Sequence, residues 1–259
     1  MSEYEAATYG EHIAEVYDDW YAEQDTEGAV EFLSGFAKGG NALELGIGTG
    51  RVALPLSARG ATVHGIDASP SMVDKMRKKP GGENIALTLG DFADVPVQGL
   101  FDLIYVVFST FFALLTQEAQ VKCFHCCAQH LKKDGVFVLE NFVPDLTRFD
   151  RGQRTDTIAI SKNMVRIEAS LHDAVKQQVH AQHILIGEKG LRLYPVQLRY
   201  VWPSELDLMA CLAKLELQNR FGGWRGESFS NASVRHISVY RHSGFSDPQN
   251  DPLSKARSF

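Results

Sequence analysis

Carboxylates and glycines at regular spacing are the residues of this chain best suited to chemistry. Gly46, Gly48 and Gly50 fall on alternate positions, and Glu44 lies two residues before the first of them. Glycine permits unusual backbone angles and lets a ligand approach the backbone amides, because it has no Cβ. Asp67 follows after about 20 residues, where a nucleotide-binding fold places a carboxylate on ribose hydroxyls. The pattern predicts a nucleotide-binding site.

The glycine pattern argues against a dinucleotide. The dinucleotide motif G-x-G-x-x-G requires glycine where this chain has Arg51. The Glu44 carboxylate would repel a pyrophosphate and attract an ammonium group. S-adenosylmethionine (SAM) carries an ammonium group and no phosphate, and the string E-x-G-x-G-x-G resembles motif I of the class I SAM-dependent methyltransferases. The resemblance implies that Glu44, Arg51 and the glycines bind SAM.

Two further strings resemble the next motifs of the same family. They are G-I-D-A-S-P-S-M-V, which contains Asp67, and Gly90-Asp91-Phe92. The resemblance implies that Asp67 binds the ribose and that Ala68 and Met72 flank the adenine. It also implies that Asp91 accepts a hydrogen bond from the exocyclic amine, beside Phe92. SAM is therefore the expected cofactor.

The N-terminal segment is rich in tyrosine. The stretch A-E-V-Y-D-x-x-Y resembles the N-terminal segment of small-molecule methyltransferases, which implies that Tyr17 and Tyr21 close over the cofactor. Electron-rich ring faces suit a methylsulfonium cation. Tyr9 and Tyr17 are the candidate catalytic residues, and Tyr9 is also a candidate for substrate binding. The alternative is a plain helix that packs on the core.

Candidate substrate-binding residues lie after the central strand and in the second half of the chain. Phe108 is predicted to bind the cofactor. It begins the aromatic run 108–112, whose phenylalanines either line a pocket or belong to the core. The run Gly222–Val239 resembles the last hairpin of small-molecule methyltransferases. His180 and His183 could accept a proton, although an exposed strand histidine is the simpler interpretation. The candidates for substrate binding are Tyr9, Phe111, Phe112, Asn141, His172, Trp224, Arg225 and Arg235.

Hydrophobic patterning predicts the elements that position these residues. Short apolar runs that alternate with helical patterns predict an α/β fold with a mostly parallel sheet. The resemblance makes it a Rossmann-like, seven-stranded sheet with helices on both faces and an antiparallel last strand. Period-2 alternation after residue 144 predicts three more strands, a small antiparallel β insert over the active site. The predicted strands of this insert are 164–171, 177–186 and 191–202.

The predicted organisation has four parts. They are an N-terminal helical lid (1–36), a Rossmann-like SAM-binding domain (37–143 and 203–242), a substrate-covering β insert (144–202) and a tail (243–259).

Composition narrows the partners and the compartment. The formal charge is −6, and a nucleic-acid binder needs a positive surface for phosphates, so we expect no nucleic-acid partner. No apolar run reaches the length of a membrane span, and the polar N-terminus is not a signal peptide, so we expect a cytoplasmic protein without a membrane partner. Cys123, Cys126, Cys127 and His130 share a helix face, but core packing explains them better than zinc, and we expect no metal.

Together these patterns predict a SAM-dependent N-methyltransferase that acts on a small-molecule amine by in-line displacement. The chain is most similar to the N-methyltransferases of antibiotic and aminosugar biosynthesis. Nitrogen is favoured over oxygen because an amine reaches its neutral form without a strong base. The alternatives are an O-methyltransferase, an NAD(P)-linked oxidoreductase and a silent SAM-fold binding protein. The sequence leaves a homo-oligomer open.

Overall fold

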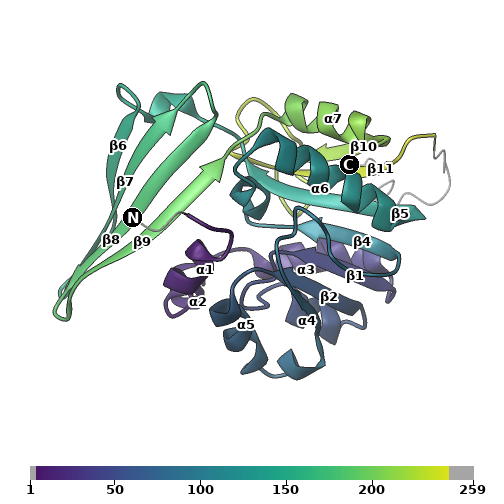
Figure 1. Cartoon of the computed structure of the whole chain (residues 1–259), viewed down its shortest axis with the longest axis horizontal. Coiled ribbons are helices and arrows are strands. Elements are labelled where there is room, and N and C mark those ends of the chain that lie inside the picture. The colour runs from purple at the N-terminus through teal and green to yellow at the C-terminus, as the bar shows by residue number, and fades with distance from the viewer. Residues whose placement is uncertain (1–3, 245–259) are drawn as a thin grey trace.

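A seven-stranded sheet forms the centre of the structure, a computed structural model that describes residues 4–244 (Figure 1). Its strand order is β10-β11-β5-β4-β1-β2-β3. Strands β1 to β5 are mutually parallel, whereas β11 runs antiparallel to both of its neighbours, β5 and β10. The strands are β1 (Asn41–Leu45), β2 (Thr62–Asp67), β3 (Ala86–Leu89), β4 (Phe101–Val106), β5 (Leu131–Phe142), β10 (Leu215–Phe221) and β11 (Arg235–His242). The predicted Rossmann-like fold is confirmed.

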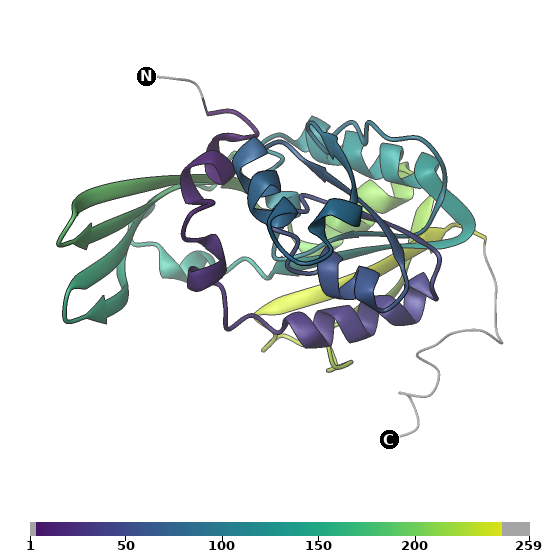
Figure 2. The same cartoon turned by 90° about the horizontal axis from the view of Figure 1, so that it is seen from below.

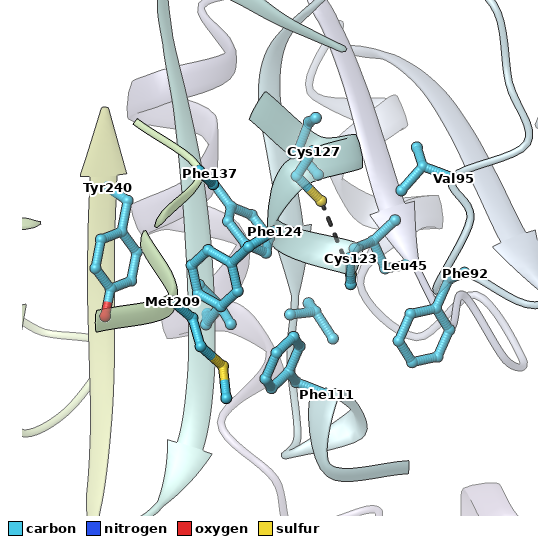
Figure 3. Packing of buried hydrophobic residues seen from close by; sticks show 14 of the residues in the cluster. Leu45, Phe92, Val95, Phe111, Cys123, Phe124, Cys127, Phe137, Met209 and Tyr240 are labelled. Atoms are coloured by element: carbon cyan, nitrogen blue, oxygen red, sulfur yellow. Dashed lines mark hydrogen bonds between the residues drawn. The ribbon is translucent and has the colours of Figure 1, made fainter. Parts of the chain in front are cut away.

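Helices cover both faces of this sheet, so its strands are buried on both sides. In β4, Ile104 packs in the cluster with α6 and α7, while its neighbours Leu103 and Tyr105 pack in the cluster with α3 and α4. Figure 3 shows the first cluster, in which Phe124 of α6 lies against the sheet. The helices are α3 (Thr26–Ala37), α4 (Ala53–Ala58), α5 (Pro70–Arg77), α6 (Gln117–His130) and α7 (Pro203–Leu212).

A separate sheet of four antiparallel strands stands off from the main sheet (Figure 1). Its strands are β6 (Gln153–Ser161), β7 (Met164–Asp173), β8 (Gln178–Gly187) and β9 (Gly190–Arg199). The sequence predicted the last three strands and missed β6. That strand is mostly polar, and its few apolar residues are consecutive at a register shift, so period-2 alternation is absent.

Buried polar contacts fix the base of the small sheet to the helices of the main sheet. Arg199, at the end of β9, donates to Gln177 Oε1 and to Glu205 Oε1 of α7, each at 2.8 Å. The Gln120 amide of α6 donates to the Arg199 carbonyl at 2.9 Å. A guanidinium withdrawn from water loses free energy of hydration unless hydrogen bonds replace the lost water contacts. The hydrogen bonds of Arg199 meet this requirement and at the same time fix the orientation of the small sheet.

Two short helices, α1 (Thr8–Ile13) and α2 (Tyr17–Trp20), lie between the two sheets (Figures 1 and 2). Ile13 is fully buried in a cluster with Met72 of α5 and Tyr194 of β9, so the segment contacts both the small sheet and a helix that covers the main sheet. The predicted lid of 1–36 also included α3, but α3 packs in the same cluster as β1 and β4. In the predicted tail, residues 245–259 lie outside the described part of the chain.

The residue pattern at 116–132 predicts a single helix, but α6 ends at His130, because β5 starts at Leu131. Within α6, Cys123 and Cys127 are buried, with their sulfur atoms 4.0 Å apart (Figure 3).

Among residues 4–244, no histidine, cysteine or carboxylate side chains gather as a metal site. In the same range, no helix has the length and apolar character required to cross a membrane.

Candidate active site

A cavity of about 750 Å³ opens at the carboxyl ends of the parallel strands, between the main sheet, the N-terminal helices and the small sheet. Open α/β sheets bind their ligands at this edge. Many predicted site residues line the cavity: Tyr9, Tyr17, Tyr21, Gly46, Gly48, Asp67, Ala68, Met72, Asp91, Phe92, Phe108 and Arg235.

The glycine loop after β1 forms one wall of the cavity. Gly46, Gly48 and Gly50 have φ of 71°, 55° and 75°, in the left-handed region. A Cβ on Gly48 would meet no atom within 4 Å, so this glycine faces open space that a ligand can fill. Gly50 does not line the cavity. Its Cβ would lie 2.7 Å from Met76 Cγ, so Gly50 serves close packing on α5.

Two carboxylates line the cavity beside this loop. Asp67, at the end of β2, accepts from Gly48 N at 2.7 Å and from Ser69 N at 2.8 Å. Burial raises the pKa of Asp67, and the two amide donors oppose that shift. Asp91 accepts from Ala93 N at 2.8 Å and is exposed. Gly90, which was predicted to bind the cofactor, does not line the cavity.

Glu44 lies behind the glycine loop, in a small pocket of about 20 Å³ that shares Gly46, Gly48 and Phe108 with the large cavity. Its carboxyl is 2 % exposed and accepts from the Tyr105 hydroxyl at 2.9 Å. Burial raises the pKa of Glu44 to about 8. The three predicted carboxylates therefore do not line one continuous wall, because Glu44 is set apart from Asp67 and Asp91.

Arg51 lies in the same small pocket. Its guanidinium donates to Thr26 Oγ1 at 3.1 Å and lies 5.1 Å from the centre of the Phe108 ring. Its buried Nε has no hydrogen-bond partner among the described residues. An acid and a guanidinium with a spare donor match the ammonium and carboxylate of an amino acid. The residues present therefore fit the amino-acid end of the expected cofactor.

Three tyrosines from the N-terminal segment cover the cavity. The Tyr17 and Tyr21 ring centres are 5.0 Å apart, and the Tyr21 and Phe108 ring centres are 4.8 Å apart. The Tyr9 and Tyr21 hydroxyls are 3.4 Å apart. Burial raises the pKa of all three phenols, that of Tyr17 to about 12. They are neutral near pH 7 and can donate hydrogen bonds, but they are poor bases.

The small sheet adds a polar cluster formed by Arg166, Glu168 and His183, of which the sequence singled out His183 alone, as a possible proton acceptor. His183 Nδ1 lies 3.6 Å from Glu168 Oε2. The Arg166 guanidinium lies 4.2 Å from the ring centre of Trp20. Burial lowers the pKa of His183, and Arg166 lowers it further, while Glu168 raises it. Arg166 and Glu168 are two residues apart on β7 and therefore lie on the same face of the sheet. This spacing is the one feature of the sequence that could have identified them.

A second charged pair lies where β5 and β11 end. Arg235 Nη1 is 3.1 Å from Glu140 Oε1, and both residues line the cavity. The second oxygen of Glu140 accepts from Phe108 N at 2.8 Å. Phe108 and Ser109 have φ of 57° and 59°, which is uncommon for residues other than glycine. Glu140 thus supports the strained turn that presents Phe108 to the cavity.

Six of the eight predicted substrate residues do not line the cavity. Phe111 and Phe112 are fully buried in the core cluster with α6. Asn141 is fully buried, because it follows Glu140 in β5 and alternate strand residues face opposite sides. Trp224 is buried, with its ring centre 5.4 Å from that of Phe32, while the exposed Arg225 lies 3.5 Å from Asp25 Oδ2.

His172 is also outside the cavity. Its ring stacks on Phe149, with centres 4.6 Å apart, and its Nε2 lies 2.9 Å from the Tyr200 hydroxyl. These contacts place it at the base of the small sheet. The residue type suited proton transfer, but its position in β7 could not be read from the sequence.

Comparisons with known proteins agree with this geometry. A family model described as a methyltransferase domain matches residues 42–135. The CcbJ methyltransferase from Streptomyces caelestis, whose structure is known, is 38% identical to this chain and superposes with a TM-score of 0.88, over 93% of this chain and 100% of that chain. The cypemycin N-terminal methyltransferase from a Streptomyces species is 28% identical over 78% of this chain and 82% of that protein.

A more distant relative shares the fold. CalS10, an amino pentose methyltransferase from Micromonospora echinaspora, is known as a SAM-bound structure. It is 19% identical to this chain and superposes with a TM-score of 0.67 over 94% of this chain and 99% of that chain.

Proposed function

Because the chain belongs to the SAM-dependent methyltransferases, we propose that it methylates an amine nitrogen of a small natural-product or amino-sugar acceptor. The observation that carries this proposal is one cavity with two kinds of wall. Asp67 and Asp91 beside the glycine loop suit a nucleoside, whereas Glu168 and His183 of the small sheet suit a polar acceptor. The similarity to the cypemycin N-terminal methyltransferase supports nitrogen as the methylated atom.

In this proposal the chain holds the cofactor at three points. Asp67 would accept from the ribose hydroxyls and Asp91 from the adenine amine, because carboxylate oxygens are free to accept further hydrogen bonds there. Glu44 and Arg51 would hold the ammonium and carboxylate of the amino-acid end. SAM supplies a methyl group made electrophilic by a positively charged sulfur.

The residues around the transferred methyl group would act mainly by position. The rings of Tyr17, Tyr21 and Phe108 form a wall that excludes water and presents electron-rich faces to a cation. Alignment of amine and methyl group at near-attack distance supplies most of the acceleration, and a water-poor pocket favours loss of the sulfonium charge. His183 is neutral near pH 7 and would take the proton that the amine gives up.

A methylation screen tests the proposal. The protein is incubated with SAM and a panel of amino sugars, lincosamide-like amines and phenols, and the products are read by mass spectrometry. We expect donor-dependent mass gains of one methyl group on amines. Transfer to phenols alone would contradict nitrogen as the acceptor atom and support the O-methyltransferase alternative.

Calorimetry with S-adenosylhomocysteine (SAH) tests the cofactor site separately. Asp67→Ala removes a carboxylate that lines the cavity, so SAH should bind at least about tenfold more weakly. Asp134→Ala is the matched control, because Asp134 is exposed before the buried part of β5. Binding of NAD, or equal SAH binding by Asp67→Ala and the wild type, would refute the site.

A further inference from the structure

One guanidinium in the cavity has no anionic partner. Arg166 of β7 lines the cavity, yet no carboxylate of residues 4–244 forms an ion pair with it, and its buried Nε has no hydrogen-bond partner. The other arginine of the cavity, Arg235, is paired with Glu140 at 3.1 Å. A guanidinium withdrawn from water costs free energy unless an anion compensates it. Arg166 is thus the cation of this cavity that is available to a ligand.

The guanidinium is also held in a fixed orientation. It stacks on the indole of Trp20, at 4.2 Å from the ring centre, and Trp20 in turn packs edge-on against His183 and Tyr194. Stacking on an aromatic face leaves the edge of the planar guanidinium free for bidentate hydrogen bonds. A preorganised fork of this kind binds a carboxylate without a further loss of side-chain freedom.

The surrounding charges favour a carboxylate over a phosphate. Glu168 lies two residues along the same strand face and lines the same cavity. Its carboxylate would repel a dianion more strongly than a monoanion, and a single negative charge balances Arg166. Glu168 faces His183, whose lowered pKa keeps it neutral near pH 7, so the Glu168 charge is free to attract a cation.

From this arrangement we propose that Arg166 binds a carboxylate group of the acceptor, and that the acceptor is an amino acid or an amine that carries a carboxylate. Its ammonium faces Glu168 before it loses a proton. The amine part of this inference rests on the proposed function, whereas the carboxylate site at Arg166 stands on its own geometry.

Ligand-observed NMR on the SAH-loaded protein tests the site, with sodium benzoate as the probe and benzamide as its uncharged analogue. We expect saturable benzoate binding that Arg166→Met weakens at least tenfold, with no such effect on benzamide. Arg192→Met is the matched control, because Arg192 lies on β9 outside the cavity and pairs with the exposed Glu15. It should bind benzoate as the wild type does.

Two outcomes overturn the proposal: equal benzoate binding by Arg166→Met and the wild type, or no saturable binding by the wild type up to about 50 mM. Should Arg166→Met fail to fold, Arg166→Lys takes its place, since it keeps the charge and loses the planar fork; it should weaken binding by a smaller factor. This titration involves no methyl transfer, so it can succeed or fail independently of the methylation screen.

Discussion

At the scale of single residues, the buried Glu44 carboxyl has the clearest physical consequence. Its pKa of about 8 means that it is mostly protonated in the ligand-free protein near pH 7. An ammonium group placed beside it favours the ionised form, so the site must release a proton as the ligand binds.

We therefore predict that SAH binding releases a proton below pH 8 and that affinity rises with pH until about that value. Calorimetry in two buffers of different ionisation enthalpy measures the proton count directly. Glu44→Gln cannot release a proton and should bind SAH with little dependence on pH between 6 and 8. A wild-type proton count of zero would contradict the role of Glu44 at the ammonium.

The Tyr17 hydroxyl provides a second prediction. The Arg51 guanidinium opposes the rise in its pKa, and the Tyr17 ring lies beside Tyr21. Tyr17→Phe keeps the ring and removes a hydroxyl that lines the cavity, so kcat should fall about two- to tenfold while the fold persists. Tyr194→Phe is the control, since the buried Tyr194 hydroxyl has no hydrogen-bond partner within residues 4–244 and does not line the cavity. Unchanged kinetics for Tyr17→Phe would remove this hydroxyl from the site.

Residue type and motif spacing identified part of the site from the sequence. Gly48, Asp67 and Asp91 line the cavity as expected, because local strand-turn-helix geometry determines where they point. Phe112 and Trp224 do not, since pocket wall and core use the same apolar side chains. Arg166 was missed because its partners, Trp20 and the cavity, are brought together only by tertiary packing.

At the scale of elements, the N-terminal helices are held in place by a few polar contacts. Glu11 of α1 accepts from Ser69 Oγ at 2.6 Å, from Ser71 N at 3.0 Å and from Ser71 Oγ at 2.7 Å. It therefore lies at the positive end of α5. Asp18 of α2 accepts from Thr49 Oγ1 at 2.6 Å, which ties the segment to the glycine loop.

We predict that Glu11→Ala loosens this cover, because three hydrogen bonds to one carboxylate are lost. SAH should dissociate on the order of tenfold faster in stopped-flow measurements. Glu15→Ala is the control, since Glu15 is exposed and pairs with Arg192 of the small sheet at 3.4 Å. If the two variants released SAH at the same rate, α1 would have no part in retaining the cofactor.

The sequence predicted most elements but not their limits. Strands of the main sheet follow continuous apolar runs, which are visible without tertiary information. Strand β6 was missed because it is mostly polar, its apolar residues are consecutive, and its register shifts beside Thr157. The end of α6 was misplaced because Leu131 pairs with Phe101 in the sheet, a contact distant in sequence.

At the scale of the whole molecule, a buried histidine links stability to pH. His236 of β11 is fully buried, and its Nδ1 lies 2.9 Å from Ser238 Oγ. Burial, together with the nearby Arg220, lowers the pKa of His236 to about 4, although Asp207 opposes the shift. The folded protein therefore resists protonation that the unfolded chain, with an ordinary histidine pKa of about 6.5, accepts.

The pKa of His236 is lower in the folded protein than in the unfolded chain. Burial of the neutral imidazole therefore leaves the free energy of unfolding at its full value above pH 6.5, and that free energy falls as the pH drops towards 4. The expected loss is about 3 kcal/mol in the free energy of unfolding. His236→Gln should reduce the fall in melting temperature across that range, whereas His125→Gln, at an exposed position of α6, should not. Parallel melting curves for His236→Gln and the wild type would refute this linkage.

The orientation of the small sheet could not be predicted from the sequence. Alternation identified three of its strands, but its position over the cavity depends on the contacts of Arg199 with Glu205 and Gln120. Gln120 is distant from Arg199 along the chain, and nothing in the local pattern marks Arg199, Glu205 and Gln120 as partners. The acceptor side of the site was therefore the least predictable part of the molecule.

The N-terminal segment crosses from one sheet to the other: the Gln197 amide of β9 donates to the Tyr4 hydroxyl at 3.1 Å, and Asp18 reaches the glycine loop. Because this segment covers the cavity, we expect substrate entry and product release to require that it opens, a step separate from bond making. Substitutions intended to raise the turnover rate should accordingly begin with contacts of this segment made by residues outside the cavity lining, such as that of Asp18 with Thr49.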